Sequence, residues 1–108
     1  MSVLAGDHIL FAISPLAMES YFGSCFSDFD HVLEAGSAIS QNGNDAIELY
    51  EQNQVIETFG DINVDGTGEV WEYTDSWAYK LGNEWTYGGV NCTDDSETSA
   101  SSNCPYPL

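Results

Sequence analysis

Oxygen-bearing side chains recur at regular spacing between residues 61 and 72. In a twelve-residue loop, oxygen atoms at positions one, three, five, seven, nine and twelve can surround a hard cation, while a glycine at position six allows a sharp turn. The six ligand positions hold Asp61, Asn63, Asp65, Thr67, Glu69 and Glu72. Gly66 is the sixth residue of the loop, where the sharp turn is expected. In this pattern position seven contributes its backbone carbonyl, and position nine often acts through water. The spacing therefore predicts a calcium site.

Two residues of this segment depart from the calcium loop of an EF-hand. Val64 is β-branched at position four, and Gly68 stands at position eight, where an EF-hand has the aliphatic residue that pairs two loops. The flanking residues 55–59 and 76–80 are rich in β-branched and aromatic side chains, which favours strands over the helices of an EF-hand. We expect one calcium loop inserted between two strands, with a role in stability rather than signalling.

An alternative is that a long surface connection between strands is simply rich in Asp, Asn and Gly and holds no ion. Carboxylates about 6 Å apart in one loop repel each other by about 1 to 3 kcal/mol per pair at an effective dielectric constant of about 20 to 80. A bound cation or broad solvation would relieve this repulsion. The complete set of ligand positions favours the cation.

The net charge of the chain limits its partners. The 18 acidic residues and a single basic one give a formal charge of −17 over 108 residues. Such a surface repels nucleic acid and anionic membranes, so we expect neither as a partner. The hydrophobic share of 43% is that of a packed globular protein, and this length suits one domain.

The three cysteines, Cys25, Cys92 and Cys104, lack the spacing of a zinc site. We therefore expect a disulfide and an extracytoplasmic location, which is extracellular, at the cell surface or periplasmic. Pairing of Cys92 with Cys104 would contribute about 3 kcal/mol through loop entropy, and pairing of Cys25 with either is equally compatible with the sequence. The odd cysteine suggests a partner beyond Leu108. We expect no signal peptide and no membrane span, hence a trimmed protein or a fragment.

Strands are the main elements expected around the acidic loop. One short amphipathic helix is predicted over residues 15–22, with Ser14 as N-cap, Pro15 in the first turn and Gly23 at its end. We expect this helix to cover one end of a sheet. The predicted strand segments are 8–13, the hairpin of 45–50 with 55–59 through a four-residue connection, and the hairpin of 77–81 with 84–87. The passage from 26 to 33 is expected to be irregular or a short strand. A domain over residues 1–90 is predicted to precede a polar segment, 91–108.

No group of side chains has the spacing of a catalytic site. His8 and His31 have no partner defined by spacing, and Cys25 lacks basic neighbours that would lower its pKa. Glu48 and Glu57 are expected on a solvated face of paired strands. The aromatic residues after the loop form one predicted core face or, less favoured, a platform for sugar or protein partners: Trp71, Tyr73, Trp77, Tyr79, Trp85 and Tyr87. We therefore expect that the chain is not an enzyme.

Three stretches resemble the lamin-tail domain of bacterial secreted and surface proteins, including some extracellular nucleases. Residues 4–12 look like the glycine-led strand of that family, residues 43–50 its G-x-D-A core strand that ends in L-Y, and residues 55–60 its strand that ends in F-G. The match to residue 87 is looser. The resemblance implies an immunoglobulin-like β-sandwich, mainly β and incomplete here because the first strands of the domain are missing. The short strands and frequent turns agree with it.

This resemblance leads to the functional hypothesis of a non-catalytic, extracytoplasmic binding or accessory module stabilised by calcium. Its partners would be a protein or glycan on a cell surface, or other domains of a larger secreted protein. The alternatives are a metal-dependent hydrolase or a fragment of an extracellular nuclease, and a purely structural domain without a ligand.

Overall fold

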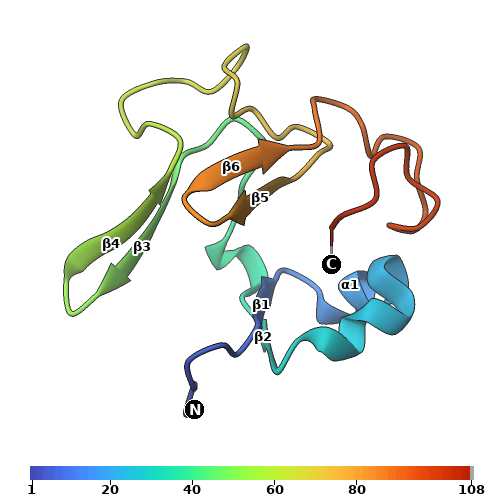
Figure 1. The fold of residues 1–108 in the computed structure, drawn as a ribbon, viewed down its shortest axis with the longest axis horizontal. Helices are drawn as coiled ribbons and strands as arrows, with labels where there is room; N and C mark the ends of the chain where they lie inside the picture. Colours follow the sequence, from blue (N-terminus) through green and yellow to red (C-terminus); the bar gives the residue numbers. More distant parts are fainter. Residues whose placement is uncertain (108) are drawn as a thin grey trace. The chain divides into compact units, whose positions relative to one another are not determined.

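The computed structural model describes residues 1–107, and strands with one α-helix make up most of its regular structure (Figure 1). In chain order the elements are β1 (Ile9–Ala12), α1 (Pro15–Phe22), the 3₁₀ helix η1 (Gly23–Asp28), β2 (His31–Glu34), the 3₁₀ helix η2 (Gly36–Ala38), β3 (Ile47–Glu51), β4 (Gln54–Phe59), β5 (Ala78–Leu81) and β6 (Glu84–Tyr87). Contacts divide the chain into two compact units, residues 1–40 with 95–106 and residues 41–94 with 107. This division does not test the predicted boundary at residue 90.

The first unit contains one parallel pair of strands. β1 and β2 pair in register from Ile9 with His31 to Ala12 with Glu34, and α1 with η1 forms the crossover between them. The predicted helix is confirmed at both ends: Ser14 Oγ accepts a hydrogen bond from the backbone of Ala17, and Gly23 ends the helix at a φ of 60°. No residue of α1 is fully buried, but Met18, Tyr21 and Phe22 on its apolar face are half-buried, and the helix contacts β1 and β2.

The segment after residue 95 belongs to this first unit. The Ser99 amide donates to the Tyr21 carbonyl over 2.9 Å, and the Tyr21 and Ser96 hydroxyls are 3.1 Å apart. The rings of Phe22 and Tyr106 meet edge to face with centroids 5.9 Å apart. Polar and aromatic contacts therefore attach this serine-rich segment to α1.

The second unit contains two antiparallel hairpins, β3 with β4 and β5 with β6. Both hairpins were expected, but the first connection is shorter than the predicted four residues. Gln52 and Asn53 have φ values of 50° and 65°, the left-handed conformations of a two-residue hairpin turn. The strands consequently extend to Glu51 and Gln54. A register shift between Leu49 and Tyr50 interrupts the ladder.

The core of the second unit is aromatic. Phe59 at the end of β4 is 6% exposed, and its ring meets those of Trp71, Tyr73, Trp85 and Tyr87 at centroid distances of 6.0, 5.5, 4.8 and 6.5 Å. Trp71 is 8% exposed. Four of the predicted aromatic residues therefore do pack around one buried ring.

The prediction of a mainly β protein with a single short helix is confirmed for the described part of the chain, where strands hold 25% of the residues. The finer expectation of an immunoglobulin-like sandwich is not confirmed. Within residues 1–107 the strands form three separate two-stranded sheets rather than two extended layers.

Replacement of Phe59 by Ala removes the ring that the other four contact, and we expect a loss of about 3 to 5 kcal/mol in the free energy of unfolding. The measurement is urea unfolding followed by tryptophan fluorescence and circular dichroism. Ile56→Ala is the matched control, because Ile56 lies on the same strand and is 54% exposed. Equal losses for the two variants would contradict the central position of Phe59.

Candidate metal site

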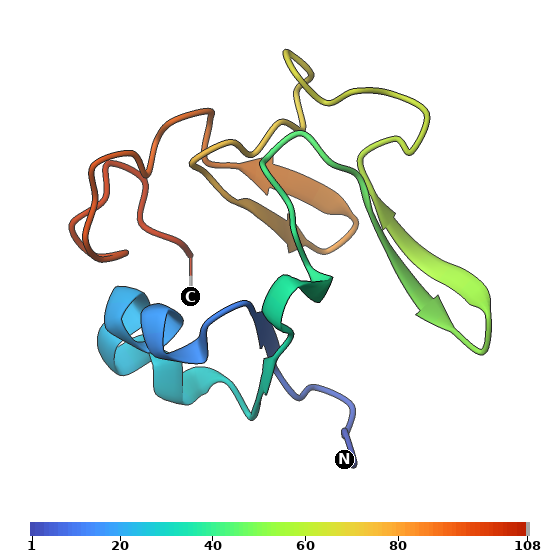
Figure 2. The same ribbon diagram turned by 180° about the vertical axis from the view of Figure 1, so that it is seen from behind.

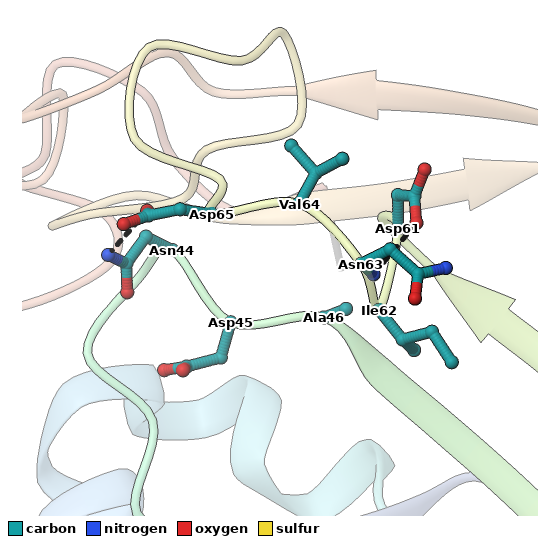
Figure 3. A pocket seen from close by; sticks show the side chains of 8 residues that line it. All are labelled: Asn44, Asp45, Ala46, Asp61, Ile62, Asn63, Val64 and Asp65. Carbon is teal, nitrogen blue, oxygen red and sulfur yellow. Dashed lines mark hydrogen bonds between the residues drawn. The ribbon is translucent and has the colours of Figure 1, made fainter.

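The predicted calcium loop borders an open depression of about 480 Å³ in the second unit (Figure 3). Its lining consists of residues 44–46, which lead into β3, and residues 61–65, which follow β4. Figure 3 shows Asp65 beside Asn44 at one end, and Asp61 with Asn63 at the other. Asp45 also lines the depression, and its spacing from the acidic loop gave no signal in the sequence.

The first ligand positions form a hydrogen-bonded turn. The Asp61 carboxylate accepts from the Asn63 amide over 2.9 Å, and the Val64 amide donates to the Asp61 carbonyl over 3.1 Å. A short side chain that binds the backbone two residues ahead is typical of Asp in turns. The β-branched Val64 is accommodated at the fourth position of this turn.

Asp65 is the most heavily hydrogen-bonded carboxylate of the loop. Its Oδ1 atom accepts from the Thr67 amide over 3.0 Å, from Thr67 Oγ1 over 2.8 Å and from Asn44 Nδ2 over 3.1 Å. These hydrogen bonds lower the pKa of Asp65 below its usual value of 3.8. The backbone amide of Thr67 contributes most, followed by the Thr67 hydroxyl and then the side-chain amide of Asn44. Asn44 therefore joins the loop to the start of the hairpin.

Glu72, the predicted twelfth ligand, closes the other end of the loop. Its Oε2 atom accepts from the Gly68 amide over 2.7 Å, and its Oε1 atom accepts from the Thr74 hydroxyl over 3.0 Å. Glu69 is exposed. The carboxylate at the twelfth ligand position thus accepts hydrogen bonds from two donors of its own segment.

Gly66 has a different role from the one that its position in a calcium loop predicts. Its amide donates to the Asn44 carbonyl over 3.0 Å, and a Cβ atom there would lie 2.5 Å from Trp71 Cζ3. The left-handed turn falls two residues later, at Gly68, whose φ is 81°. Gly60 also approaches the Trp71 ring, with 2.8 Å from a Cβ atom to Cε3. Close packing on this ring, rather than the turn, requires glycine at position 66.

The acidic side chains among the predicted ligands are not gathered into one group. In the part of the chain that the structure describes, no three His, Cys, Asp or Glu side chains are grouped so that they could hold a metal ion. The carboxylate and amide oxygens have the hard character that calcium prefers. However, Asp61, Asp65 and Glu72 accept hydrogen bonds from amides of their own loop. Calcium at this loop stays a prediction.

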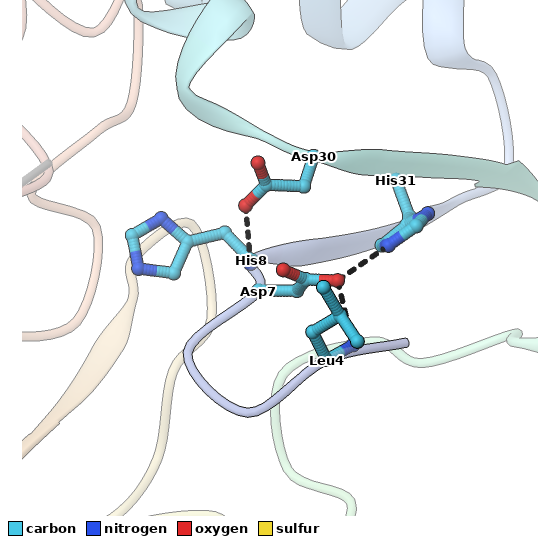
Figure 4. Close-up of polar contacts among 5 residues, drawn as sticks. All are labelled: Leu4, Asp7, His8, Asp30 and His31. Atoms are coloured by element: carbon cyan, nitrogen blue, oxygen red, sulfur yellow. Dashed lines mark hydrogen bonds and ion pairs between the residues drawn. The ribbon is translucent and has the colours of Figure 1, made fainter. Parts of the chain in front are cut away.

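The histidines lie in the first unit, at the start of the parallel strands (Figure 4). His31 Nε2 is 2.8 Å from Asp7 Oδ2, and the same oxygen accepts from the Leu4 amide over 2.8 Å. The Leu4 amide first, and His31 second, lower the pKa of Asp7. The Asp30 carboxylate accepts from the His8 amide, and the His8 ring points away from Asp7 (Figure 4). No sequence spacing could reveal these pairs, because they arise from the pairing of β1 with β2.

The other acidic residues singled out in the sequence also have partners. Glu57 forms an ion pair of 2.7 Å with Lys80, and Glu48 accepts from the Tyr50 hydroxyl over 2.7 Å, which raises the pKa of Tyr50. The two glutamates lie on the paired strands β3 and β4, as expected.

The structure selects one of the disulfides that the sequence left open. Cys92 is bonded to Cys104, and Cys25 carries a free thiol. Among residues 1–107 no helix is both long and apolar enough to cross a membrane.

The sequence matches no protein-family model, and no curated protein or solved structure is detectably similar to it.

The lowered pKa of Asp65 predicts a pH dependence of stability. The ionised carboxylate stabilises the folded state fully above its usual pKa of 3.8, and this contribution is lost as the pH falls through the lower folded value. We expect the melting temperature of Asp65→Asn to fall less than that of the parent protein between pH 6 and pH 2. Thermal denaturation at several pH values measures this difference.

The control is Asp28→Asn, which removes the same charge from an exposed position in η1. The stability that is lost when other carboxylates, including Asp7, become protonated at low pH is lost in both variants and therefore cancels in the comparison. If the Asp65→Asn and Asp28→Asn variants lost stability in parallel as the pH falls, the predicted role of the Asp65 hydrogen bonds would be wrong.

Proposed function

We propose that this chain is a non-catalytic binding or accessory module of a secreted or surface protein, and that calcium stabilises it. The observation that carries the proposal is the depression of about 480 Å³, whose lining includes the carboxylates of Asp45, Asp61 and Asp65 and the side-chain amides of Asn44 and Asn63. Oxygen donors of this kind are the usual ligands of calcium. The predicted ligand set is Asp61, Asn63, Asp65, Thr67, Glu69 and Glu72.

Electrostatics supports a cation in this depression. The formal charge of −17 attracts divalent cations, and the repulsion among the negative charges destabilises the compact folded state. The loop amides now bound to Asp61 and Asp65 offset part of the local repulsion. An ion that gathers these carboxylates would have to shift the loop, so binding would be accompanied by a change in the loop conformation.

The disulfide between Cys92 and Cys104 supports an extracytoplasmic location, because such bonds persist in oxidising compartments. A lamin-tail type of domain with an immunoglobulin-like arrangement is part of the same proposal. It is supported by the three stretches that carry the resemblance, since they include β1 and most of β3 and β4. The partners in this proposal are a protein or glycan at a cell surface, or other domains of the same protein.

Calcium titration of chelator-treated protein tests the proposal. We expect saturable heat in calorimetry and, at calcium about a hundredfold above the dissociation constant, a stabilisation of about 2.7 kcal/mol. For a domain of this size that corresponds to a rise in melting temperature of roughly 10 to 20 °C. Asp65→Ala and Asp61→Asn should each lose most of the calcium-induced rise, whereas Asp28→Asn should retain it.

Two results would overturn this proposal. The first is no heat and no change in melting temperature up to about 10 mM calcium, which lies above the weak range of extracellular sites. The second is metal-dependent hydrolysis of a phosphodiester or glycoside that Asp65→Ala abolishes, since this would make the loop a catalytic centre.

A further inference from the structure

The second unit has another hollow, of about 370 Å³, that the acidic loop does not border. We call it the groove, and its lining residues come from both hairpins and the segments beside them: Gln41, Ile47, Leu49, Glu57, Phe59, Tyr73, Ala78 and Trp85. Most of these side chains are apolar or aromatic. Concave sites with such a lining and few polar groups are the usual binding sites for ligands.

The wall of the groove on the β3 side is exposed. Ile47 and Leu49 are 38% and 56% exposed, and the buried Phe59 ring lies in the same lining. Leu49 is directly opposite Glu57 in the register of the hairpin. Exposed apolar side chains next to a buried aromatic ring indicate a contact surface.

The charge around the groove defines the chemistry of its occupant. Lys80 is the single basic side chain of the chain; its ammonium group lies 2.7 Å from the Glu57 carboxylate and 5.6 Å from the centroid of the Trp85 ring. Glu57 and Trp85, which line the groove, therefore already bind the ammonium group of Lys80 through an ion pair and a cation–π contact. With a formal charge of −17, the protein attracts further cations and repels anions.

The backbone at this place favours an extended occupant. Within the described residues β3 is hydrogen-bonded only to β4, so one of its edges is not used in a ladder. Figures 1 and 2 both draw β3 as the strand of its hairpin that is nearer to β5 and β6. A peptide that adds to such an edge gains backbone hydrogen bonds and presents alternate side chains to one face.

We propose that the groove binds an extended segment of a partner protein in which apolar residues alternate with Lys or Arg. The apolar side chains enter the hollow over Phe59, beside Leu49 and Trp85. The basic side chains alternate with them and therefore face the other side of the hairpin, toward Glu48 and the acidic surface. This inference deepens the binding-module function proposed above and rests on it, because it names the class of partner.

The probe is a seven-residue peptide of alternating Lys and Leu, acetylated and amidated at its ends. Titration calorimetry should give one-to-one binding that weakens with added salt, because charge contributes to it. Leu49→Thr should weaken binding by about tenfold, as expected for the loss of one buried apolar contact. Ile56→Thr, a matched change at an equally exposed position of the same hairpin outside the groove, should change it less than about twofold.

A second peptide, with Ser in place of Leu, keeps the charge and lacks the apolar anchors. We expect it to bind at least tenfold more weakly than the Lys and Leu peptide. Equal binding of both peptides, or equal effects of Leu49→Thr and Ile56→Thr, would show attraction by charge alone and overturn the proposal. Binding of neutral oligosaccharides at the groove without peptide binding, or a dimer in sedimentation that Leu49→Thr dissociates, would also overturn it.

Each titration is repeated with calcium and with chelator. If calcium gives neither heat nor a rise in melting temperature while peptide binding persists and depends on Leu49, only the calcium part of the proposed function is refuted. A clear calcium effect without Leu49-dependent peptide binding would refute only the groove.

Discussion

The packing of aromatic rings around Phe59 is the interaction on which the second unit depends. The side chain lies at the end of β4 and joins that hairpin to Trp71 near the end of the acidic loop, to Tyr73 just after the loop, and to Trp85 and Tyr87 on β6. Short two-stranded hairpins are marginal in water by themselves, so a shared ring provides the burial that each lacks. Edge-to-face geometry adds to the energy of this burial.

The same packing determines the conformation of the acidic loop. Gly60 and Gly66 both approach the Trp71 ring so closely that a Cβ atom would overlap it, and this fixes both the start and the middle of the loop. The backbone amides of this compact loop have no partner strand, and the carboxylates of Asp61, Asp65 and Glu72 accept hydrogen bonds from three of them. A sequence with the ligand spacing of a calcium loop can therefore fold first around a tryptophan and use its carboxylates as turn caps.

Local signals in the sequence predicted local structure well. Ser14, Pro15 and Gly23 delimit α1, and the second hairpin follows its turn residues, because caps and turns depend on neighbours in the chain. The first hairpin was predicted, but the two-residue length of its turn at residues 52–53 was not, since neither residue is glycine although both adopt positive φ. Contacts between Asp7 and His31, or Asp45 and the loop, depend on pairing and packing across many residues, and ligand spacing alone does not predict whether side chains converge.

A hydrogen bond connects the lining of the depression with the lining of the groove. Tyr73 lines the groove, and its hydroxyl donates to the carbonyl of Asp45, which lines the depression, over 3.0 Å. Burial first, and then the charge of Asp45, raise the pKa of Tyr73 above its usual value of 10.0. A rearrangement of the depression that moves the Asp45 carbonyl must then move or break the bond to Tyr73. By thermodynamic linkage, an ion that favours one position of Asp45 changes the affinity of the groove, and a peptide in the groove changes the affinity for the ion by the same factor.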